Sequence, residues 1–357
     1  NHWQRWPEDL DLMAELGLST YRFSGDWSRA QPTPDRFDYQ AMRQFAAMVE
    51  GCHDRGITPM FTYHHYTDPT WVDWEQAATV NLFANYVRQL SYVFASQGVE
   101  LPYALVINEP EVKAGLGYAP FVGGIYPPQK KSARAYLRVD RHLAEAHKRG
   151  YDIIKQVYPD AQVASAISNV HYQPASGRYQ RLNRQWVKLY RWLSNYRFHD
   201  RIQDYQDFIA LNHYMHCVVD GLLPPSNLFQ NPSEQPRSDL GWFLNPGSMY
   251  HVLMELHRRY RKPIVITENG LATNDDRRRV QFITDTLTQV GRAMAEGVDV
   301  RGYLHWTLFG DVTWEWDKGF WPDFGLTGVD PRTQERSPRP SAHLLGNLAK
   351  TKALNVT

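Results

Sequence analysis

Short apolar runs alternate along the chain with longer stretches in which apolar residues recur every three or four positions. The short runs are rich in β-branched residues and are bounded by turn residues, which is typical of strands buried on both faces of a sheet. We expect strands at residues 20–24, 57–63, 103–107, 162–167 and 207–211, from residue 264, and at 300–306. The longer stretches predict helices at about residues 7–16, 39–55, 75–96, 132–158, 179–198, 247–260, 276–296 and 340–350.

This strict alternation of strand and helix predicts an α/β protein with parallel strands and helices outside them. We expect a (β/α)8 TIM-barrel type of fold, although only seven strands are evident and a closed barrel of this class has eight. A doubly wound open sheet is the alternative, and it would need a glycine-rich phosphate turn near the first strand, which is absent. No change in composition marks a boundary, so residues 1–357 are expected to form a single barrel domain.

Two glutamates stand out because each follows a buried strand directly and has an asparagine beside it. Glu109 follows Asn108 at the end of strand 103–107, and Glu268 precedes Asn269 at the end of the strand that starts at residue 264. A lone Glu in such a place is costly unless it is paired or used, and it can be a structural residue under a turn. Two of them at the carboxyl ends of barrel strands, where such barrels build their sites, form a candidate catalytic pair.

Composition and charge argue against several classes of partner and site. A net charge of +1 and a pI near 7.9 imply no polyanionic partner, so we expect no nucleic-acid binding. No apolar run reaches the roughly 18 residues of a membrane span. Cys52 and Cys217 are too few for a disulfide framework, and we expect free thiols in a reducing compartment, the cytoplasm. The pairs His64-His65 and His213-x-x-His216 lack a second set of ligands, so we expect no metal.

Aromatic residues are abundant, with 12 Trp, 21 Tyr and 15 Phe, and many follow strand ends. In any fold they bury apolar area in the core. Gathered beside carboxylates at the mouth of a barrel, they also suit stacking against the apolar face of a sugar ring.

Four motifs occur in a fixed order and together carry a family resemblance. They are Tyr21-Arg22-Phe23-Ser24-x-x-Trp27-Ser28-Arg29, Thr62-Tyr63-His64-His65-Tyr66, Asn108-Glu109-Pro110 and Ile266-Thr267-Glu268-Asn269-Gly270. With these motifs the chain resembles glycoside hydrolase family 1, the β-glucosidase and β-galactosidase group, from about Trp3 to the C-terminus.

The resemblance implies a retaining β-glycosidase that hydrolyses terminal β-D-glycosides, most readily a β-glucoside or a related oligosaccharide, without a cofactor. Glu268 would be the nucleophile and Glu109 the general acid/base. Retaining enzymes of this kind hold the two carboxyl groups about 5–5.5 Å apart, so that one attacks the anomeric carbon while the other protonates the leaving oxygen.

The resemblance also implies supporting roles. Arg22 would keep Glu268 ionised, Tyr214 would orient it, and Asn108 would hold the sugar 2-hydroxyl. Further residues expected at the site are Asn212, which would support catalysis, His65 and Tyr66, which would bind the sugar, and Trp306, its platform. A purely structural role remains the alternative for Arg22, His65, Asn212, Tyr214 and Trp306.

The chain departs from the family pattern after its last strand. The family has a Trp, six residues, and then Glu-Trp, whereas Trp306 is followed by Glu315-Trp316 after eight residues. We align Glu315 and Trp316 with the sugar-binding pair because Asp317-Lys318-Gly319-Phe320 continues the pattern; otherwise Thr313 takes the Glu position. With Glu315 in place, a 6-phosphorylated sugar is disfavoured by charge repulsion.

A larger departure is the absence of the family's first strand. Without it we expect an open seam in the barrel, filled by another segment, by a partner chain or by solvent, and exposed edges there invite a homo-oligomer. An open seam also favours a rival interpretation, a weakly active or inactive barrel that only binds glycosides. A third interpretation is an endo-acting glucanase, in which long loops shape a cleft. The loops at 115–128 and 221–237 would contact the aglycone.

Overall fold

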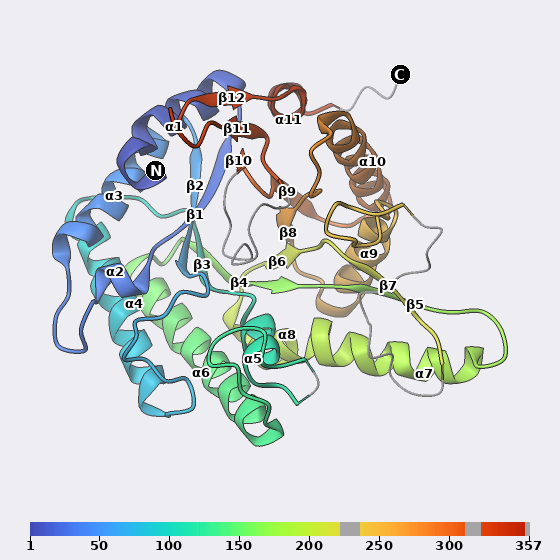
Figure 1. The fold of residues 1–357 in the computed structure, drawn as a ribbon. Helices are drawn as coiled ribbons and strands as arrows, with labels where there is room; N and C mark the ends of the chain where they lie inside the picture. The colour runs from blue at the N-terminus through green and yellow to red at the C-terminus, as the bar shows by residue number, and fades with distance from the viewer. Residues whose placement is uncertain (121, 222–235, 311–322, 354–357) are drawn as a thin grey trace.

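Seven parallel strands form the centre of the structure, a computed structural model that describes residues 1–120, 122–221, 236–310 and 323–353. They follow one another in chain order around a nearly closed barrel (Figure 1). The strands are β1 (Thr20–Ser24), β2 (Thr58–His64), β3 (Tyr103–Asn108), β4 (Gln162–Ser168), β6 (Ile209–Asn212), β8 (Ile264–Asn269) and β9 (Val300–His305). This arrangement confirms the predicted α/β barrel, because every expected strand is present within two residues of its expected start.

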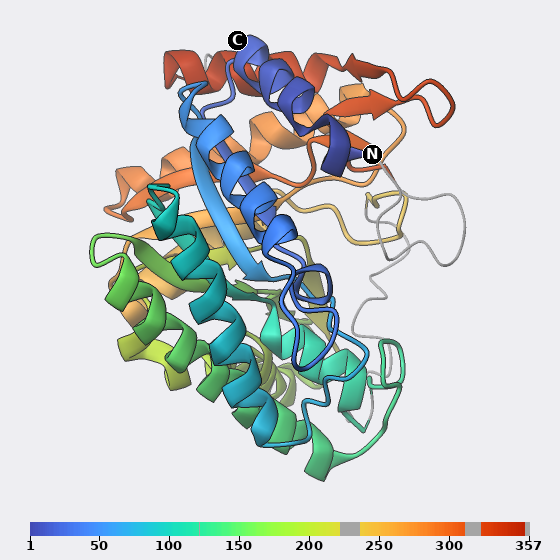
Figure 2. The same cartoon turned by 90° about the vertical axis from the view of Figure 1, so that its left-hand side faces the viewer.

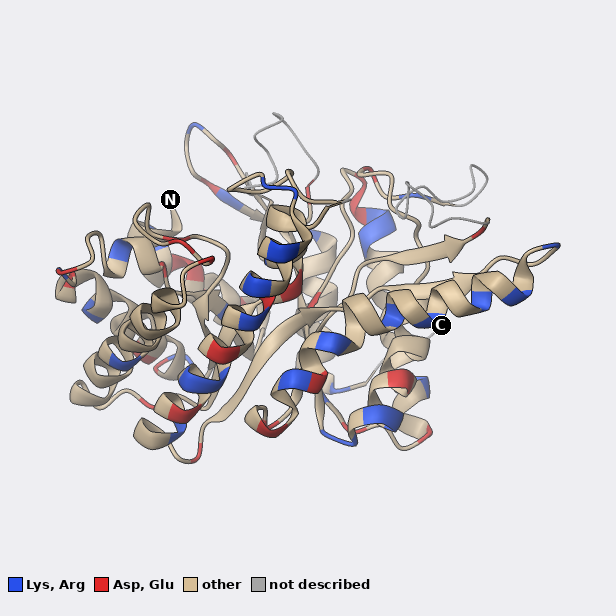
Figure 3. Ribbon diagram, turned by 90° about the horizontal axis from the view of Figure 1, so that it is seen from below, with Lys and Arg blue, Asp and Glu red and all other residues tan. Residues whose placement is uncertain are grey.

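Helices surround the barrel, and the apolar side chains on their inner faces form the core with the strands (Figure 1). Several begin at a side-chain cap: Asp38, Ser132 and Asp275 each accept a hydrogen bond from a backbone amide in the first turn. The main helices are α1 (His2–Leu16), α3 (Tyr39–His53), α4 (Ala78–Ser96), α6 (Ala133–Val157), α7 (Gln180–Tyr190), α8 (Arg197–Ile202), α9 (Ser248–Tyr260), α10 (Asp276–Ala295) and α11 (Pro340–Thr351). Basic and acidic residues are interspersed over the described surface (Figure 3).

The first helix starts earlier than the sequence pattern indicates, at His2 rather than at Pro7. A proline inside a helix leaves the carbonyl four residues before it without an amide partner. Here that carbonyl belongs to Trp3, and the side-chain amide of Gln44 in α3 donates to it at 2.6 Å. A contact from a distant helix therefore allows α1 to continue through Pro7.

Several smaller elements were not expected. Helix α5 (Pro110–Tyr118) occupies part of the stretch that we expected to be a loop, because Pro110 suits its first turn and Gly117 packs closely against Pro127. The helical stretch expected at 179–198 is divided by a π-helical segment at Arg191–Tyr196. The others are α2 (Trp27–Ala30), a 3-10 turn at Gln203–Tyr205, the pair β5 (His171–Pro174) and β7 (His216–Val219), and the small sheet of β10 (Phe309–Gly310), β11 (Thr327–Val329) and β12 (Arg336–Pro338).

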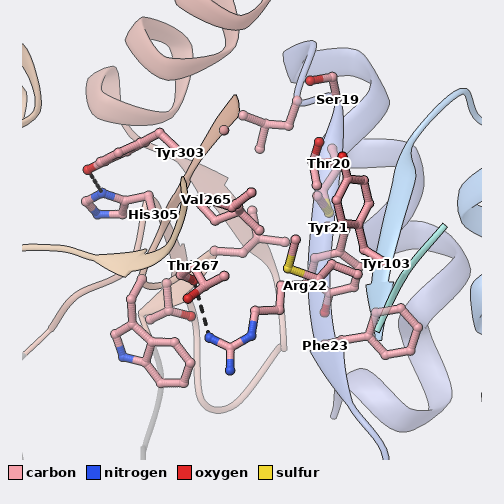
Figure 4. A pocket seen from close by; sticks show the side chains of 18 of the residues that line it. Ser19, Thr20, Tyr21, Arg22, Phe23, Tyr103, Val265, Thr267, Tyr303 and His305 are labelled. Atoms are coloured by element: carbon pink, nitrogen blue, oxygen red, sulfur yellow. Dashed lines mark hydrogen bonds between the residues drawn. The ribbon is translucent and has the colours of Figure 1, made fainter. Parts of the chain in front are cut away.

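A cavity lies between the first and last strands of the barrel. Among the described residues, β1 pairs only with β2 and β9 pairs only with β8, so these two edges face each other without backbone pairing. Figure 4 shows Thr20 and Tyr21 on one side of this cavity and Val265 and Tyr303 on the other. Its volume is about 920 Å³. The expectation that an eighth strand belongs in this seam stays a prediction.

Two further observations concern the cysteines and the character of the helices. Cys52 and Cys217 are buried free thiols, and burial raises the pKa of each to about 12. Within the part of the chain that the structure describes, no helix combines the length and the apolar character needed to cross a bilayer.

Helices α1 and α11 lie side by side, as Figures 1 and 2 both show. Gly346 of α11 is buried at this contact, and a methyl group added there would lie 1.9 Å from the carbonyl oxygen of Leu16. Only glycine lets the two backbones approach so closely.

We therefore expect Gly346→Ala to lower the stability of the protein by about 1–3 kcal/mol, because the backbones must separate to admit the methyl group. Gly291 is the matched control: it lies inside α10 with open space around it, so Gly291→Ala should raise stability by about 0.5–1 kcal/mol. Thermal unfolding of both variants beside the wild type measures the difference. Equal melting temperatures for the two variants would contradict the close contact.

Candidate active site

The candidate catalytic residues meet at the carboxyl end of the barrel because each lies in or directly after a strand. Arg22 lies in β1, Asn108 ends β3 and precedes Glu109, Asn212 ends β6, and Glu268 lies near the end of β8. Parallel strands place these ends on one rim, so residues 246 positions apart in sequence come into contact there.

Glu268 is held by two side chains, one on each of its carboxylate oxygens. Arg22 Nη1 donates to Oε1 at 2.5 Å, and the phenol of Tyr214 donates to Oε2 at 2.8 Å. The side chains of Arg22 and Glu268 are each only 7% exposed, so this ion pair is shielded from solvent. An ionised carboxylate is stabilised there, with its orientation fixed from both sides.

Glu109 has a different environment. Asn212 Nδ2 donates to its Oε1 at 2.9 Å, and the phenol of Tyr66 donates to its Oε2. Burial, and then the nearby negative charge of Glu268, raises the pKa of Glu109 to about 7, although the hydrogen bonds from Tyr66 and Asn212 and the charge of Arg22 act in the opposite direction. A carboxyl group with this pKa can give up and take back a proton near neutral pH.

A chain of hydrogen bonds joins the two glutamates. Arg22 Nη2 donates to Asn108 Oδ1 at 2.5 Å, and Asn212 Nδ2 donates to the same oxygen at 3.2 Å. Asn212 is fixed in turn by the hydroxyl of Thr267, which donates to its Oδ1 at 2.7 Å. The two carboxyl groups are thus linked through Arg22, Asn108 and Asn212.

His65 and Trp306 lie together beside this chain. Their rings stack with centroids 5.7 Å apart, and Asn108 Nδ2 lies 3.2 Å from Nε2 of His65. Burial, followed by the charge of Arg22, lowers the pKa of His65 well below its ordinary value, so the imidazole is neutral at pH 7. Both residues line the seam cavity, as do Arg22 and Thr267, which lie in the lower part of Figure 4.

The structure brings most of the predicted site residues together. The hydroxyl of Tyr66 donates to Glu109, and the expectation that Tyr66 binds the sugar stays a prediction. Glu315 and Trp316 lie outside the described residues, as does most of the loop expected at 221–237.

Sequence reasoning missed residues that act behind the predicted ones. Thr267, between Ile266 and Glu268, fixes Asn212, and Lys113 donates to the backbone carbonyl of Tyr66 at 2.8 Å. Lys113 lies four residues after Glu109, one helical turn along α5, and that spacing is the only signal the sequence offered.

The arrangement provides a proton donor and an anion on one rim. The pKa of Glu109 is raised to about 7, while Glu268 is paired with Arg22. Among the described residues, His, Cys, Asp and Glu form no group of three that could hold a metal ion. Two carboxyl groups in such unequal settings suit a reaction in which one attacks carbon and the other transfers a proton.

The sequence matches one protein family and is similar to several β-glucosidases. The profile of the family described as glycosyl hydrolase family 1 matches residues 1–200 and 177–354. β-Glucosidase A of Thermotoga maritima is 26% identical over 398 residues, covering 99% of this chain and 87% of that protein. β-Glucosidase A of Acetivibrio thermocellus is 28% identical, covering 96% of this chain and 85% of that protein.

Solved structures agree. The β-glycosidase from Pyrococcus horikoshii superposes with a TM-score of 0.89 at 30% identity, covering all of this chain and 86% of that one. The β-glucosidase from Thermotoga maritima in complex with glucoimidazole also gives a TM-score of 0.89, at 25% identity, with 99% of this chain and 88% of that chain covered.

The proximity of the two carboxyl groups predicts that removing one charge changes the titration of the other. We expect Glu268→Gln to lower the pKa of Glu109 from about 7 by about one to two units, because a like charge is lost while Arg22 remains. Carbon NMR of protein labelled at the glutamate carboxyl carbons measures this, with Glu109→Gln used to assign the resonance. Glu50→Gln, an exposed change on α3, is the control and should leave the titration in place. An unchanged pKa in Glu268→Gln would show that the two groups do not interact.

Proposed function

We propose catalytic roles for two glutamates of this chain. The premise is that the chain belongs to glycosyl hydrolase family 1 and is a β-glycosidase. Glu268 is the nucleophile and Glu109 is the general acid/base. The substrate is a terminal β-D-glycoside, with a β-glucoside as the preferred class, which is supported by the names of the similar β-glucosidases.

In the first step a carboxylate oxygen of Glu268 attacks the anomeric carbon, and the bond from that carbon to the glycosidic oxygen breaks. Glu109 gives its proton to the departing oxygen, so the aglycone leaves as a neutral alcohol and the sugar stays on Glu268 as an ester. In the second step Glu109, now ionised, takes a proton from water as that water attacks the same carbon. Glu268 leaves as a carboxylate, Glu109 regains its proton, and two inversions retain the configuration.

The observation that carries this assignment is the unequal setting of the two carboxyl groups. Glu268 has a guanidinium on one oxygen and a phenol on the other, whereas Glu109 is buried with only neutral donors and has a pKa of about 7. A nucleophile must be ionised before the reaction starts and an acid must be protonated, so the roles follow from the partners.

The remaining site residues act on the sugar. Asn108 receives the 2-hydroxyl, His65 binds on the 3-hydroxyl side, and Trp306 is the platform beneath the ring, a set supported by the contacts among these three side chains. Glu315 and Trp316 are proposed to bind the 4- and 6-hydroxyls on the strength of the sequence pattern alone. These placements bring the sugar across the rim between Glu109 and Glu268.

We propose three further properties of the chain. Residues 1–357 work as one catalytic domain. The protein acts in the cytoplasm, which is supported by its buried free cysteines. A catalytically inert barrel that only binds glycosides is disfavoured, since the contacts around Glu109 and Glu268 are in place.

The test of the catalytic roles is release of nitrophenol from an aryl β-glucoside and an aryl β-galactoside. We expect Glu268→Ala to lose roughly 10⁴–10⁶-fold in kcat, because no group remains to form the ester. Added azide should restore part of the turnover in this variant by attacking from the vacated side. Glu145→Ala is the matched control, since Glu145 is exposed on α6 and is paired there with Lys148. Turnover in Glu268→Ala close to that of the wild type would refute the assignment.

A homo-oligomer formed through the seam is a separate proposal, supported by the facing edges of β1 and β9. An unpaired strand edge exposes backbone donors and acceptors that a second chain can satisfy. Sedimentation velocity over a range of protein concentrations should therefore show a dimer that increases with concentration. A single monomeric species over the whole range would refute it.

A further inference from the structure

We propose that Lys113 and Asp68 are positioning residues that hold Tyr66 in the one conformation in which its phenol reaches Glu109. This inference rests on the proposed role of Glu109 as the acid/base. It assigns a function to Lys113 and Asp68, which form an ion pair with each other.

The backbone at Tyr66 is unusual. The amide of Thr67 donates to the carbonyl of His65 at 2.8 Å, which closes a three-residue turn centred on Tyr66 directly after β2. Tyr66 has φ 65° in this turn, a value that a bulky side chain rarely adopts. A turn of this kind persists only when its surroundings hold it.

Lys113 stabilises this turn through a hydrogen bond to its backbone. Its ammonium group donates to the carbonyl of Tyr66 at 2.8 Å and to Asp68 Oδ2 at 2.5 Å. The Lys113 side chain is only 10% exposed, so these partners replace most of its solvation. Lys113 lies in α5, the helix that begins immediately after Glu109, so the segment that carries the acid also fixes the turn that carries its hydrogen-bond donor.

Asp68 anchors Lys113. His64 Nε2 lies 2.8 Å from Asp68 Oδ1, and the indole of Trp74 donates to the same oxygen at 2.9 Å. Burial acts to raise the pKa of Asp68, but Lys113 and His64 outweigh it and the pKa is lowered, so the group is a carboxylate at neutral pH. The carboxylate and the ammonium therefore form a fixed pair between the end of β2 and α5.

The consequence for Glu109 follows from what surrounds it. Burial and the charge of Glu268 in β8 favour the protonated form of Glu109, and Arg22 in β1 opposes them. Glu111 in α5 also lies near Glu109, and burial, followed by the charge of Glu109, raises the pKa of Glu111 well above its usual value. Tyr214, which donates to Glu268, faces Glu109 as well.

Against these groups, the donors from Tyr66 and Asn212 are the hydrogen bonds that stabilise ionised Glu109. If the turn at Tyr66 relaxes, one of the two is lost and Glu109 keeps its proton to higher pH. The Lys113–Asp68 pair thereby sets the upper pH limit of activity without touching substrate.

The test is the pH dependence of kcat/KM on an aryl β-glycoside. Tyr66→Phe should move the alkaline limb of the profile upward by about one pH unit, the size expected for losing one hydrogen bond to a charged group. Lys113→Met should move it in the same direction. Lys130→Met is the matched control: Lys130 is also paired with a carboxylate, that of Glu75, but on the exposed surface, and its profile should match the wild type.

The double variant Tyr66→Phe/Lys113→Met separates positioning from a direct effect of the lysine charge. If Lys113 acts through Tyr66, the double variant has the same alkaline limb as Tyr66→Phe alone. A further upward shift in the double variant would show that the charge of Lys113 acts on Glu109 directly, which would overturn the proposal. Asp68→Asn, which keeps the size of the side chain, should reproduce part of the Lys113→Met shift and provides a second variant should Lys113→Met fail to fold.

A readout without turnover keeps this proposal distinct from the proposed function. In the Glu268→Gln background, carbon NMR of the glutamate carboxyl groups follows the titration of Glu109 directly. Adding Tyr66→Phe or Lys113→Met should raise its pKa by about the same amount as the kinetic shift. An unchanged titration overturns the positioning role even if the wild type is active. A raised pKa in a protein that hydrolyses no aryl glycoside upholds the positioning role and overturns only the proposed function.

Discussion

The buried ion pair between Arg22 and Glu268 is the constraint on which the rest of the site depends. Removing two charges from water is costly, and the cost is recovered only when every donor and acceptor finds a partner. Arg22 meets that condition by donating to Glu268, Asn108, the carbonyl of Thr267 and the hydroxyl of Thr62. These partners lie on three different strands besides that of Arg22, so satisfying one guanidinium fixes the relative positions of four strand ends.

The position of Arg22 also explains why the two glutamates have different surroundings. The guanidinium of Arg22 donates a hydrogen bond directly to Glu268. It is connected to Glu109 only through the hydrogen bonds of Asn108 and Asn212. One carboxyl group therefore has a full positive charge beside it, and the other has amide and phenol donors in a buried setting. The barrel thus gives two carboxyl groups of the same type different surroundings, because the Arg22 guanidinium contacts only one of them.

The strands and the positions of Glu109 and Glu268 at strand ends could be predicted from sequence because both are local signals. A run of β-branched residues followed by Asn-Glu-Pro or Glu-Asn-Gly identifies a strand and what lies at its end. What could not be predicted depends on distant contacts. The helix through Pro7 needs Gln44, and the turn at Tyr66 needs Lys113, 47 residues away. The expected role of Tyr66 in sugar binding stays a prediction, and nothing local indicates that its phenol contacts Glu109. The roles of Glu315 and Trp316 stay predictions from sequence.

The seam cavity extends from apolar helix residues such as Leu345 and Met294 up to Arg22. His65 and Trp306 line the same cavity, so it reaches both the ion pair and the side chains proposed to bind the sugar. The strength of a charge pair depends on the polarisability of everything around it, and water in this channel would weaken the attraction between Arg22 and Glu268. Whatever fills the seam cavity thus sets the local dielectric around this ion pair: an apolar filling strengthens the attraction between Arg22 and Glu268, and water weakens it, with no change in either side chain.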